Sequence, residues 1–187
     1  MCGIVGYVGP QNATPILIEG LSRLEYRGYD SAGIAVISDG GELQVRKAAG
    51  KLSNLRTALI AEEPCGQTGI GHTRWATHGR PSDDNAHPHL DCSGGITVVH
   101  NGIIEHYAEL RDDLIAKGHR FRSETDTEVL AHLIEDALAT SGGGLAEAVR
   151  AALRRVTGSY AIAVVSRDHP GHLVGARLNG PLIVGLG

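Results

Sequence analysis

The second residue of the chain is a cysteine, and its position gives it unusual chemical options. If Met1 is removed, Cys2 carries a nucleophilic thiol and a free α-amine on the same residue. An α-amine has a pKa of about 7.7–8.0 and a thiol of about 8.5, so a base and a nucleophile are both present near neutral pH. Such a residue can attack an acyl carbon. The cysteine could equally be a buried structural residue at the start of a strand, and Cys2 alone does not decide between these interpretations.

Other positions carry groups that suit the substrate of such a nucleophile. Arg74 follows a predicted strand and can clamp a carboxylate, while Asp126 in a first helical turn can pair with an ammonium group. Asn101 and Gly102 offer a side-chain amide and a backbone N–H, two neutral donors suited to an oxyanion, although a turn is the more common use of this dipeptide. With Cys2, these groups describe an amino acid that has a side-chain amide, which is glutamine or asparagine.

Cofactor and metal sites fit the sequence less well. Gly3, Gly6 and Gly9 do not form a GxGxxG fingerprint, and we predict that the chain needs no cofactor. The candidate metal ligands match no standard zinc spacing, and packing and hydrogen bonding within a loop are the simpler account of them. They are His72, His78, His87, His89, Cys65 and Cys92. We therefore predict no metal site.

Length and composition exclude several classes of protein. A chain of 187 residues with 42% hydrophobic and 20% charged residues fits one globular domain, residues 1–187. The net charge of -4, with scattered arginines, argues against a nucleic-acid partner. No signal peptide and no apolar run of membrane-spanning length are present, so no membrane partner is predicted. Three cysteines without CxxC spacing favour a reducing compartment, the cytoplasm.

Hydrophobic spacing and turn residues predict the elements that must position these groups. Strands are predicted at 4–8, 33–38, 42–46, 69–73, 96–100, 160–166, 172–178 and 182–184. Helices are predicted from 14 to a stop near 28, at 51–60, from 107 to a stop at 118, at 125–138 and at 145–156. Asp39-Gly40 predicts a β-hairpin, and a capping box at 125–128 is expected to open its helix.

The order of these elements indicates the fold class. Strands lie before and after a central pair of helices, without a regular βαβ alternation. Together with the predicted hairpin, this order indicates an α+β domain built on antiparallel sheet. The long polar segment 76–92 is expected to be functional, because loops of that length in a compact domain usually are.

Six motifs resemble those of a known family, in family order and over essentially the whole chain. They are MCGI at 1–4, YRGYDSAG at 26–33, HTRWATHG at 72–79, NAHPH at 85–89, HNGIIE at 100–105 and SETDTEV at 123–129. The sequence thereby resembles the class II glutamine amidotransferases and, within that class, the glucosamine-6-phosphate synthase family. Tyr29 and the Trp75-Ala76 pair speak against the asparagine synthetase and phosphoribosyl-pyrophosphate amidotransferase patterns. The resemblance implies a four-layer αββα sandwich of antiparallel sheets, the N-terminal nucleophile hydrolase fold.

The resemblance also implies a role for each site residue. Cys2, freed of Met1, would attack the side-chain amide of L-glutamine, with its own α-amine as general base through a water. Asn101 and Gly102 would form the oxyanion hole. In the family, one arginine binds the α-carboxylate, one aspartate binds the α-amine, a Trp, Thr and His shape the pocket and a second arginine supports the nucleophile. The matching residues here are Arg74, Asp126, Trp75, Thr77, His78 and Arg27, with Trp75 resembling a gate toward an ammonia channel.

The family further implies partners that this chain does not contain. A full synthase continues into C-terminal sugar isomerase domains with a fructose 6-phosphate site, forms a homodimer, and uses ammonia to make glucosamine 6-phosphate. The chain ends in PLIVGLG without a polar tail, and we expect it to be the glutaminase domain of a longer protein. Alone it would hydrolyse L-glutamine to L-glutamate and ammonia through a Cys2 thioester. The alternatives are the glutaminase domain of another class II amidotransferase, or a catalytically silent regulatory domain.

Overall fold

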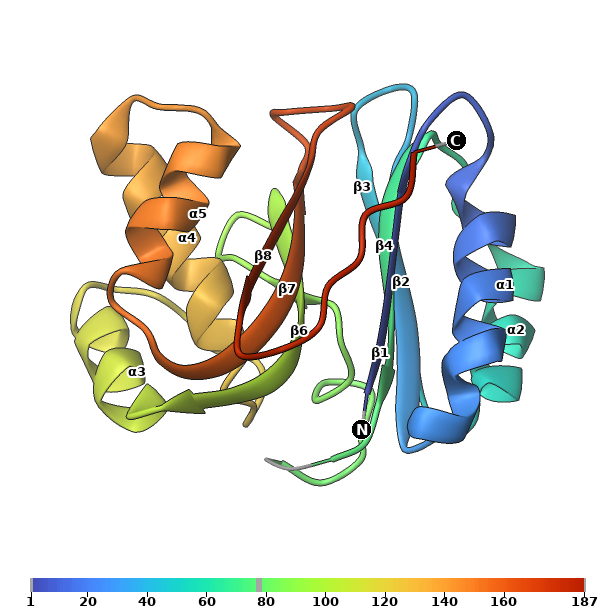
Figure 1. Cartoon of the computed structure of the whole chain (residues 1–187), viewed down its shortest axis with the longest axis horizontal. Helices are drawn as coiled ribbons and strands as arrows, with labels where there is room; N and C mark the ends of the chain where they lie inside the picture. Colours follow the sequence, from blue (N-terminus) through green and yellow to red (C-terminus); the bar gives the residue numbers. More distant parts are fainter. Residues whose placement is uncertain (1, 77–78, 187) are drawn as a thin grey trace.

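Residues 2–76 and 79–186, the part of the chain that the computed structural model describes, fold into four layers. Two four-stranded sheets pack face to face, and helices cover the outer face of each sheet (Figure 1). Every strand pairing within the two sheets is antiparallel. The predicted α+β class and αββα sandwich are confirmed.

The N-terminal half of the chain builds the first sheet and its helices. In spatial order the strands are β1 (Gly3–Val8), β4 (Thr68–Arg74), β2 (Ser31–Ile37) and β3 (Leu43–Ala49). The covering helices are α1 (Ala13–Leu24) and α2 (Leu52–Ala61), with a short 3₁₀ turn, η1 (Glu25–Arg27), after α1. The predicted hairpin at Asp39-Gly40 is confirmed, since β2 and β3 pair. Gly3 lies opposite Thr73, so the residue before β1 meets the end of β4.

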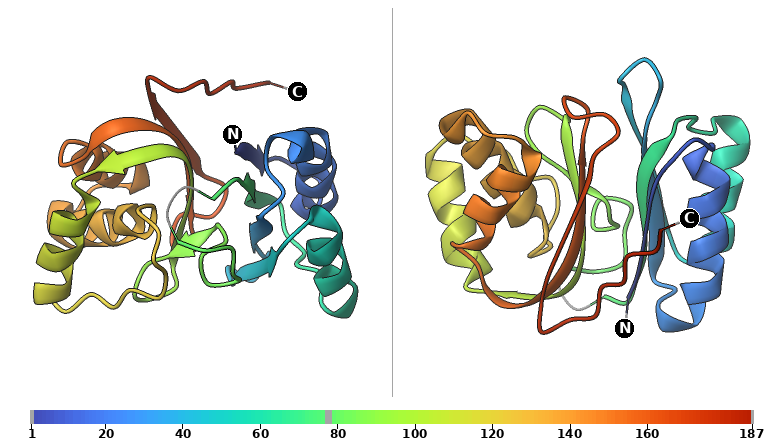
Figure 2. Two further views of the ribbon diagram at one scale, coloured as in Figure 1. Left: turned by 90° about the horizontal axis from the view of Figure 1, so that it is seen from below. Right: turned by 45° about the horizontal axis from the view of Figure 1, so that its top comes forward.

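The C-terminal half builds the second sheet and the remaining helices. In spatial order its strands are β5 (His89–Leu90), β6 (Ile96–Glu105), β7 (Thr157–Ser166) and β8 (Leu173–Leu178). The helices on its outer face are α3 (Tyr107–Ala116), α4 (Glu128–Ser141) and α5 (Leu145–Leu153) (Figure 2). No helix in the described part of the chain has the length and apolarity that a membrane crossing requires.

Apolar side chains fill three interfaces between the four layers. One cluster packs α1 and α2 against the first sheet, and a second, larger cluster packs α3, α4 and α5 against the other sheet. A third cluster lies between the sheets and consists of Ala35, Ile37, Ile70, Val99, Ala163 and Val165. Because the central strands are covered on both faces, they do not alternate between apolar and polar residues, and all seven residues of β2 are buried.

Strand β6 corrects the predicted turn at Asn101-Gly102. The prediction ended this strand at His100, whereas β6 continues through both residues to Glu105. It does so because β6 pairs with β7 along its whole length, with Ile96 opposite Ser166 and Glu105 opposite Thr157. A ladder of that length outweighs the local preference of an Asn-Gly pair for a turn.

The start of the helix predicted at 125–138 and the last predicted strand also differ in the structure. Helix α4 begins at Glu128, three residues later than predicted, and no capping box forms: the Glu128 carboxylate accepts the backbone N–H groups of Arg122 (2.8 Å) and Ser123 (2.7 Å) instead. The strand predicted at 182–184 is absent, and residues 181–186 run without regular structure from the end of β8 toward the first sheet (Figure 2).

Candidate active site

Cys2 lies directly before β1, beside the end of β4. The backbone N–H of Trp75 donates to Cys2 Sγ at 3.2 Å, and Sγ lies 3.6 Å from the carbonyl oxygen of Trp75. Burial raises the pKa of the Cys2 thiol, and the hydrogen bond from Trp75 and the positive charge of Arg74 offset this only in part. The thiol is therefore protonated at neutral pH and needs a base before it can attack.

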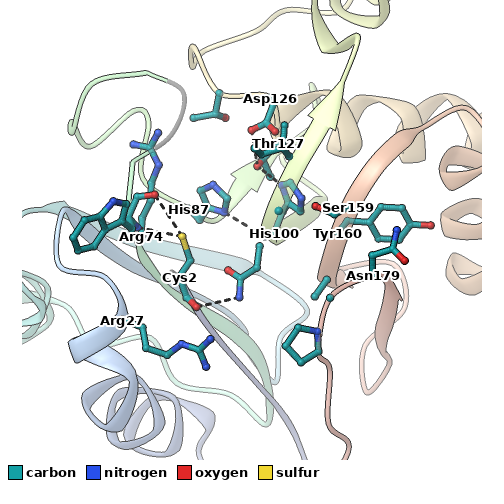
Figure 3. A pocket seen from close by; sticks show the side chains of 18 residues that line it. Cys2, Arg27, Arg74, His87, His100, Asp126, Thr127, Ser159, Tyr160 and Asn179 are labelled. Atoms are coloured by element: carbon teal, nitrogen blue, oxygen red, sulfur yellow. Dashed lines mark hydrogen bonds between the residues drawn. The ribbon is translucent and has the colours of Figure 1, made fainter.

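A cavity of about 400 Å³ opens beside Cys2 and is lined by residues from both sheets (Figure 3). That volume lies within the range of small-molecule sites, which span about 300–1,000 Å³. Most of the site residues predicted from the sequence line it: Cys2, Arg27, Arg74, Trp75, Asn101, Gly102 and Asp126. The predictions that concern Met1, Thr77 and His78 lie outside the described residues.

Asn101 is held in place by a buried histidine on the neighbouring sheet. His72 Nε2 lies 2.9 Å from Asn101 Oδ1 and 3.1 Å from the carbonyl oxygen of His100. Burial lowers the pKa of His72 to about 3, so the ring is neutral. Since both partners of Nε2 are oxygens that only accept, Nε2 carries the ring proton. The amide oxygen of Asn101 is thus turned toward His72, and its NH₂ group donates to the carbonyl oxygen of Cys2 at 3.3 Å.

Gly102 occupies a position that no other residue can take without strain. Its φ is +137°, and a Cβ there would lie 1.9 Å from the carbonyl oxygen of Ser159 on β7 and 2.9 Å from His100 Nε2. The glycine therefore lets β6 pass close to β7 at the wall of the cavity. The sequence prediction chose this residue correctly as a cavity residue but placed it in a turn.

Asp126 is anchored to β6 from the link that precedes α4. Its Oδ2 atom accepts the backbone N–H of Ile104 at 2.8 Å, and its side chain is only 4% exposed. Thr127 also joins this link to β6, because its Oγ1 atom lies 2.9 Å from Nδ1 of His100. The hydrogen bonds fix a negative charge at the cavity wall before any ligand arrives.

Arg74, the last residue of β4, supplies the opposite charge. It is 4% exposed, and its Nη2 atom donates to the carbonyl oxygen of Gly79 at 3.1 Å. Burial lowers the pKa of Arg74, while the nearby Cys2, Asp30 and Asp126 raise it. A guanidinium keeps its proton under such shifts, so Arg74 and Asp126 place a fixed cation and a fixed anion at the cavity wall.

Asp30 is a positioning residue that the sequence analysis did not identify. Its Oδ2 atom accepts the backbone N–H of Ala76 at 2.7 Å, and its own N–H donates to the carbonyl oxygen of Arg74 at 3.0 Å. Gly28 allows this close approach, since a Cβ there would lie 2.7 Å from the carbonyl carbon of Arg74. The segment that carries Arg27 thereby holds the chain at 74–76, against which the Cys2 thiol rests. The position of Asp30 inside the YRGYDSAG motif was the sequence feature that could have identified it.

Three of the histidines considered as metal ligands, His72, His87 and His89, form a buried stack. The rings of His72 and His87 stack with centroids 4.1 Å apart, and His89 meets His87 edge-on at 4.7 Å. Burial lowers the pKa of His87 and of His89 well below the ordinary value, so these rings are neutral. Within the described residues, their donor atoms do not gather with Cys65 or Cys92 around one point.

Comparison with known proteins identifies the family to which the chain belongs. A family model described as a glutamine amidotransferase domain matches residues 72–179, which include Arg74, Asn101, Gly102 and Asp126. The chain belongs to this family. The predicted resemblance to glutamine amidotransferases is therefore confirmed.

Curated relatives and solved structures agree with this assignment. Over 187 residues the chain is 59% identical to the glutamine–fructose-6-phosphate aminotransferase (isomerizing) of Thermus thermophilus and 55% identical to that of Pyrococcus horikoshii. All of the chain aligns, but it spans only 30% and 31% of these relatives. The glutamine phosphoribosylpyrophosphate amidotransferase of B. subtilis superposes with a TM-score of 0.75 at 28% identity, covering 89% of this chain and 35% of that one.

Proposed function

We propose that the chain is a glutaminase domain that hydrolyses L-glutamine to L-glutamate and ammonia through a thioester on Cys2. One observation carries the proposal: a thiol, a buried cation, a buried anion and an amide donor line the same cavity, contributed by Cys2, Arg74, Asp126 and Asn101. An amino acid with a side-chain amide is complementary to this set.

The fixed charges account for substrate binding. The guanidinium of Arg74 would take the α-carboxylate of glutamine, and the carboxylate of Asp126 would take the α-ammonium group. Both groups are almost fully buried and are positioned by hydrogen bonds to the backbone. The binding of glutamine therefore costs little side-chain conformational entropy. The substrate side chain would then reach toward Cys2.

The chemistry uses groups on both sheets. After removal of Met1, the α-amine of Cys2 would accept the thiol proton through a water, and Sγ would bond to the amide carbon. The NH₂ group of Asn101 has two N–H donors, and only one is used by the Cys2 carbonyl, so the other is available to the oxyanion together with the Gly102 N–H. The C–N bond then breaks, and the proton passes to the departing ammonia. Water attacks the thioester and restores the thiol.

The relatives' names support a wider proposal for the whole protein. They are aminotransferases acting on fructose 6-phosphate, and this chain matches under a third of their length. We infer that C-terminal sugar isomerase domains complete the protein, bind fructose 6-phosphate and use the ammonia to form glucosamine 6-phosphate in a cytoplasmic homodimer. Trp75, 45% exposed beside Cys2 and edge-on to Tyr29 at 5.4 Å, is suitably placed to gate the ammonia.

The first experiment is an intact-mass measurement of the 187-residue chain treated with a glutamine analogue that carries a diazoketone at the amide position. We expect loss of Met1 and a single adduct, which free glutamine suppresses and which Cys2→Ala removes. Cys65→Ser is the matched control, because Cys65 is an exposed cysteine away from the cavity, and it should leave labelling unchanged. A mature chain that forms no adduct would contradict the proposal and favour the silent regulatory domain.

A further inference from the structure

A second group of reactive side chains lies where α3, α4 and the loop after β5 meet, outside the cavity beside Cys2. Cys92 follows β5, His119 follows α3, and His132 and Glu135 lie one turn apart on α4. One ligand atom from each of the four residues lies within 4.8 Å of every other. Three separate elements therefore converge on one point.

Five of the six distances between the four ligand atoms resemble the edges of a tetrahedron, and the sixth, from Cys92 Sγ to a Glu135 carboxylate oxygen, is at most 4.8 Å. Nδ1 of His119 and Nδ1 of His132 are 3.3 Å apart, and Cys92 Sγ lies 3.5 Å and 3.6 Å from them. Glu135 Oε2 lies 3.0 Å and 3.3 Å from the same two nitrogens. A tetrahedral Zn²⁺ with Zn–N of about 2.0–2.1 Å and Zn–S of about 2.3 Å places its ligand atoms about 3.3–3.6 Å apart.

The outer nitrogens of both histidines face carboxylates. His119 Nε2 lies 2.9 Å from Asp136 Oδ1, and His132 Nε2 lies 3.7 Å from Glu128 Oε1. The carboxylate of Asp136 favours the His119 tautomer that carries its proton on Nε2, and the lone pair of His119 Nδ1 then points into the cluster, whereas the 3.7 Å separation at His132 is too long for a hydrogen bond. Histidines that bind metals generally have such an outer carboxylate or carbonyl partner.

The backbone holds two of the four groups in place. Glu135 Oε2 accepts the backbone N–H of Cys92 at 3.2 Å, and Cys92 Sγ accepts the backbone N–H of Arg120 at 3.4 Å. The His132 side chain is 0% exposed, so bulk water does not reach its ring. A cation at the centre would contact one ligand atom of each of the four groups at once.

We propose that Cys92, His119, His132 and Glu135 bind a Zn²⁺ ion. One thiolate, two imidazoles and one carboxylate form a ligand set that suits zinc among the common divalent metals. Four protein ligands leave no open position, which is the arrangement of a structural site and not of a catalytic one. The proposal departs from the sequence prediction of no metal, and of the residues considered there only Cys92 belongs to the proposed site.

Zinc at this point would tie together the chain on both sides of Asp126. His119 precedes Asp126, His132 follows it, and Cys92 fixes both to the loop beside β5. The metal would thus close the segment between His119 and His132 into a loop, and this segment places the Asp126 carboxylate at the cavity wall. This consequence rests on the proposed glutaminase function, whereas the existence of the metal site does not.

The test is a titration of the reduced, metal-free 187-residue chain with Co²⁺, followed by Zn²⁺. Tetrahedral cobalt with a thiolate ligand gives intense visible bands and a thiolate charge-transfer band in the near ultraviolet. We expect saturation at one cobalt per chain and loss of the bands on addition of one zinc. Cys92→Ser should remove the charge-transfer band, and Cys65→Ser, the matched control, should leave it unchanged.

A second variant tests the outer carboxylate without touching a ligand. Asp136→Asn removes the charge beside His119 Nε2 and should weaken zinc binding about 10- to 100-fold while keeping the cobalt spectrum. His119→Gln serves as a second ligand variant in case Cys92→Ser does not fold, with far-ultraviolet circular dichroism as the check of folding. Folded wild-type chain without tetrahedral cobalt bands, or bands that survive a ligand substitution, would overturn the proposal. Because the signal is spectroscopic, an inactive chain with an intact cobalt site would count only against the glutaminase proposal.

Discussion

The side-chain amide of Asn101 donates a hydrogen bond to the backbone carbonyl of Cys2 at 3.3 Å, across 99 positions of sequence. It links the start of the first sheet to the middle of the second. His72, on the first sheet, holds the other end of the same amide at 2.9 Å. Cys2 and its expected oxyanion donor are therefore positioned relative to each other by both sheets.

Asn101→Ala should lower the kcat for glutamine hydrolysis about 10²- to 10³-fold, the usual cost of removing one oxyanion donor. The KM should change little, because this donor acts on a charge that develops only in the transition state. Steady-state measurement of glutamate release separates the two constants. An unchanged kcat would remove Asn101 from the oxyanion hole and leave it only a structural bond to Cys2.

Gly102→Ala should destabilise the fold far more than the same change at another left-handed glycine. Its new Cβ would press on the carbonyl oxygen of Ser159, whereas Gly94 has φ of +69° and nothing within 4 Å of a built Cβ. Gly94→Ala should cost about 1 kcal/mol from its backbone conformation alone, and Gly102→Ala several times that. Urea unfolding of the two variants measures the difference. Equal losses would mean that the β6–β7 contact relaxes freely.

The sequence predicts the cavity well because each candidate site residue stands in a motif and has its own chemical reason to be there. Arg74, Asn101 and Asp126 were chosen on those grounds, and the fold brings them to one cavity. The turn at Asn101-Gly102 was predicted wrongly because a two-residue signal carries no information about the long β6–β7 ladder.

For residues that act through other residues, the sequence motifs give the position but not the partner. Asp30 and His72 work through backbone groups and one amide, and those partners are set by sheet register. The cluster at Cys92 gathers ligands from three elements whose meeting depends on how α3 and α4 pack, so no fixed spacing reveals it.

Asp126→Asn should raise the KM for glutamine about 10²-fold or more, because the buried charge for the α-ammonium group is lost while the side chain keeps its shape. The amide oxygen can still accept the Ile104 N–H, so the fold should persist. Reaction of Cys2 with a simple electrophile should continue at the wild-type rate. Asp112→Asn, at an exposed position, is the matched control, and an unchanged KM would show that the assigned contact is wrong.

Acid should destabilise the fold through the buried histidines, and His72 contributes a defined part. Its pKa is lowered to about 3 from 6.5, so between these values the unfolded chain binds a proton that the folded chain does not. Stability then falls as the pH falls below 6.5, by up to about 1.4 kcal/mol per pH unit for each such histidine.

His72→Gln keeps an N–H donor for Asn101, and it should flatten the dependence of unfolding free energy on pH between about 6.5 and 4.5 by about one proton. It should also retain more kcat than His72→Ala, which leaves the Asn101 amide without its partner. If the two variants lose activity equally, with the slope unchanged, then His72 neither stays neutral in the fold nor positions Asn101.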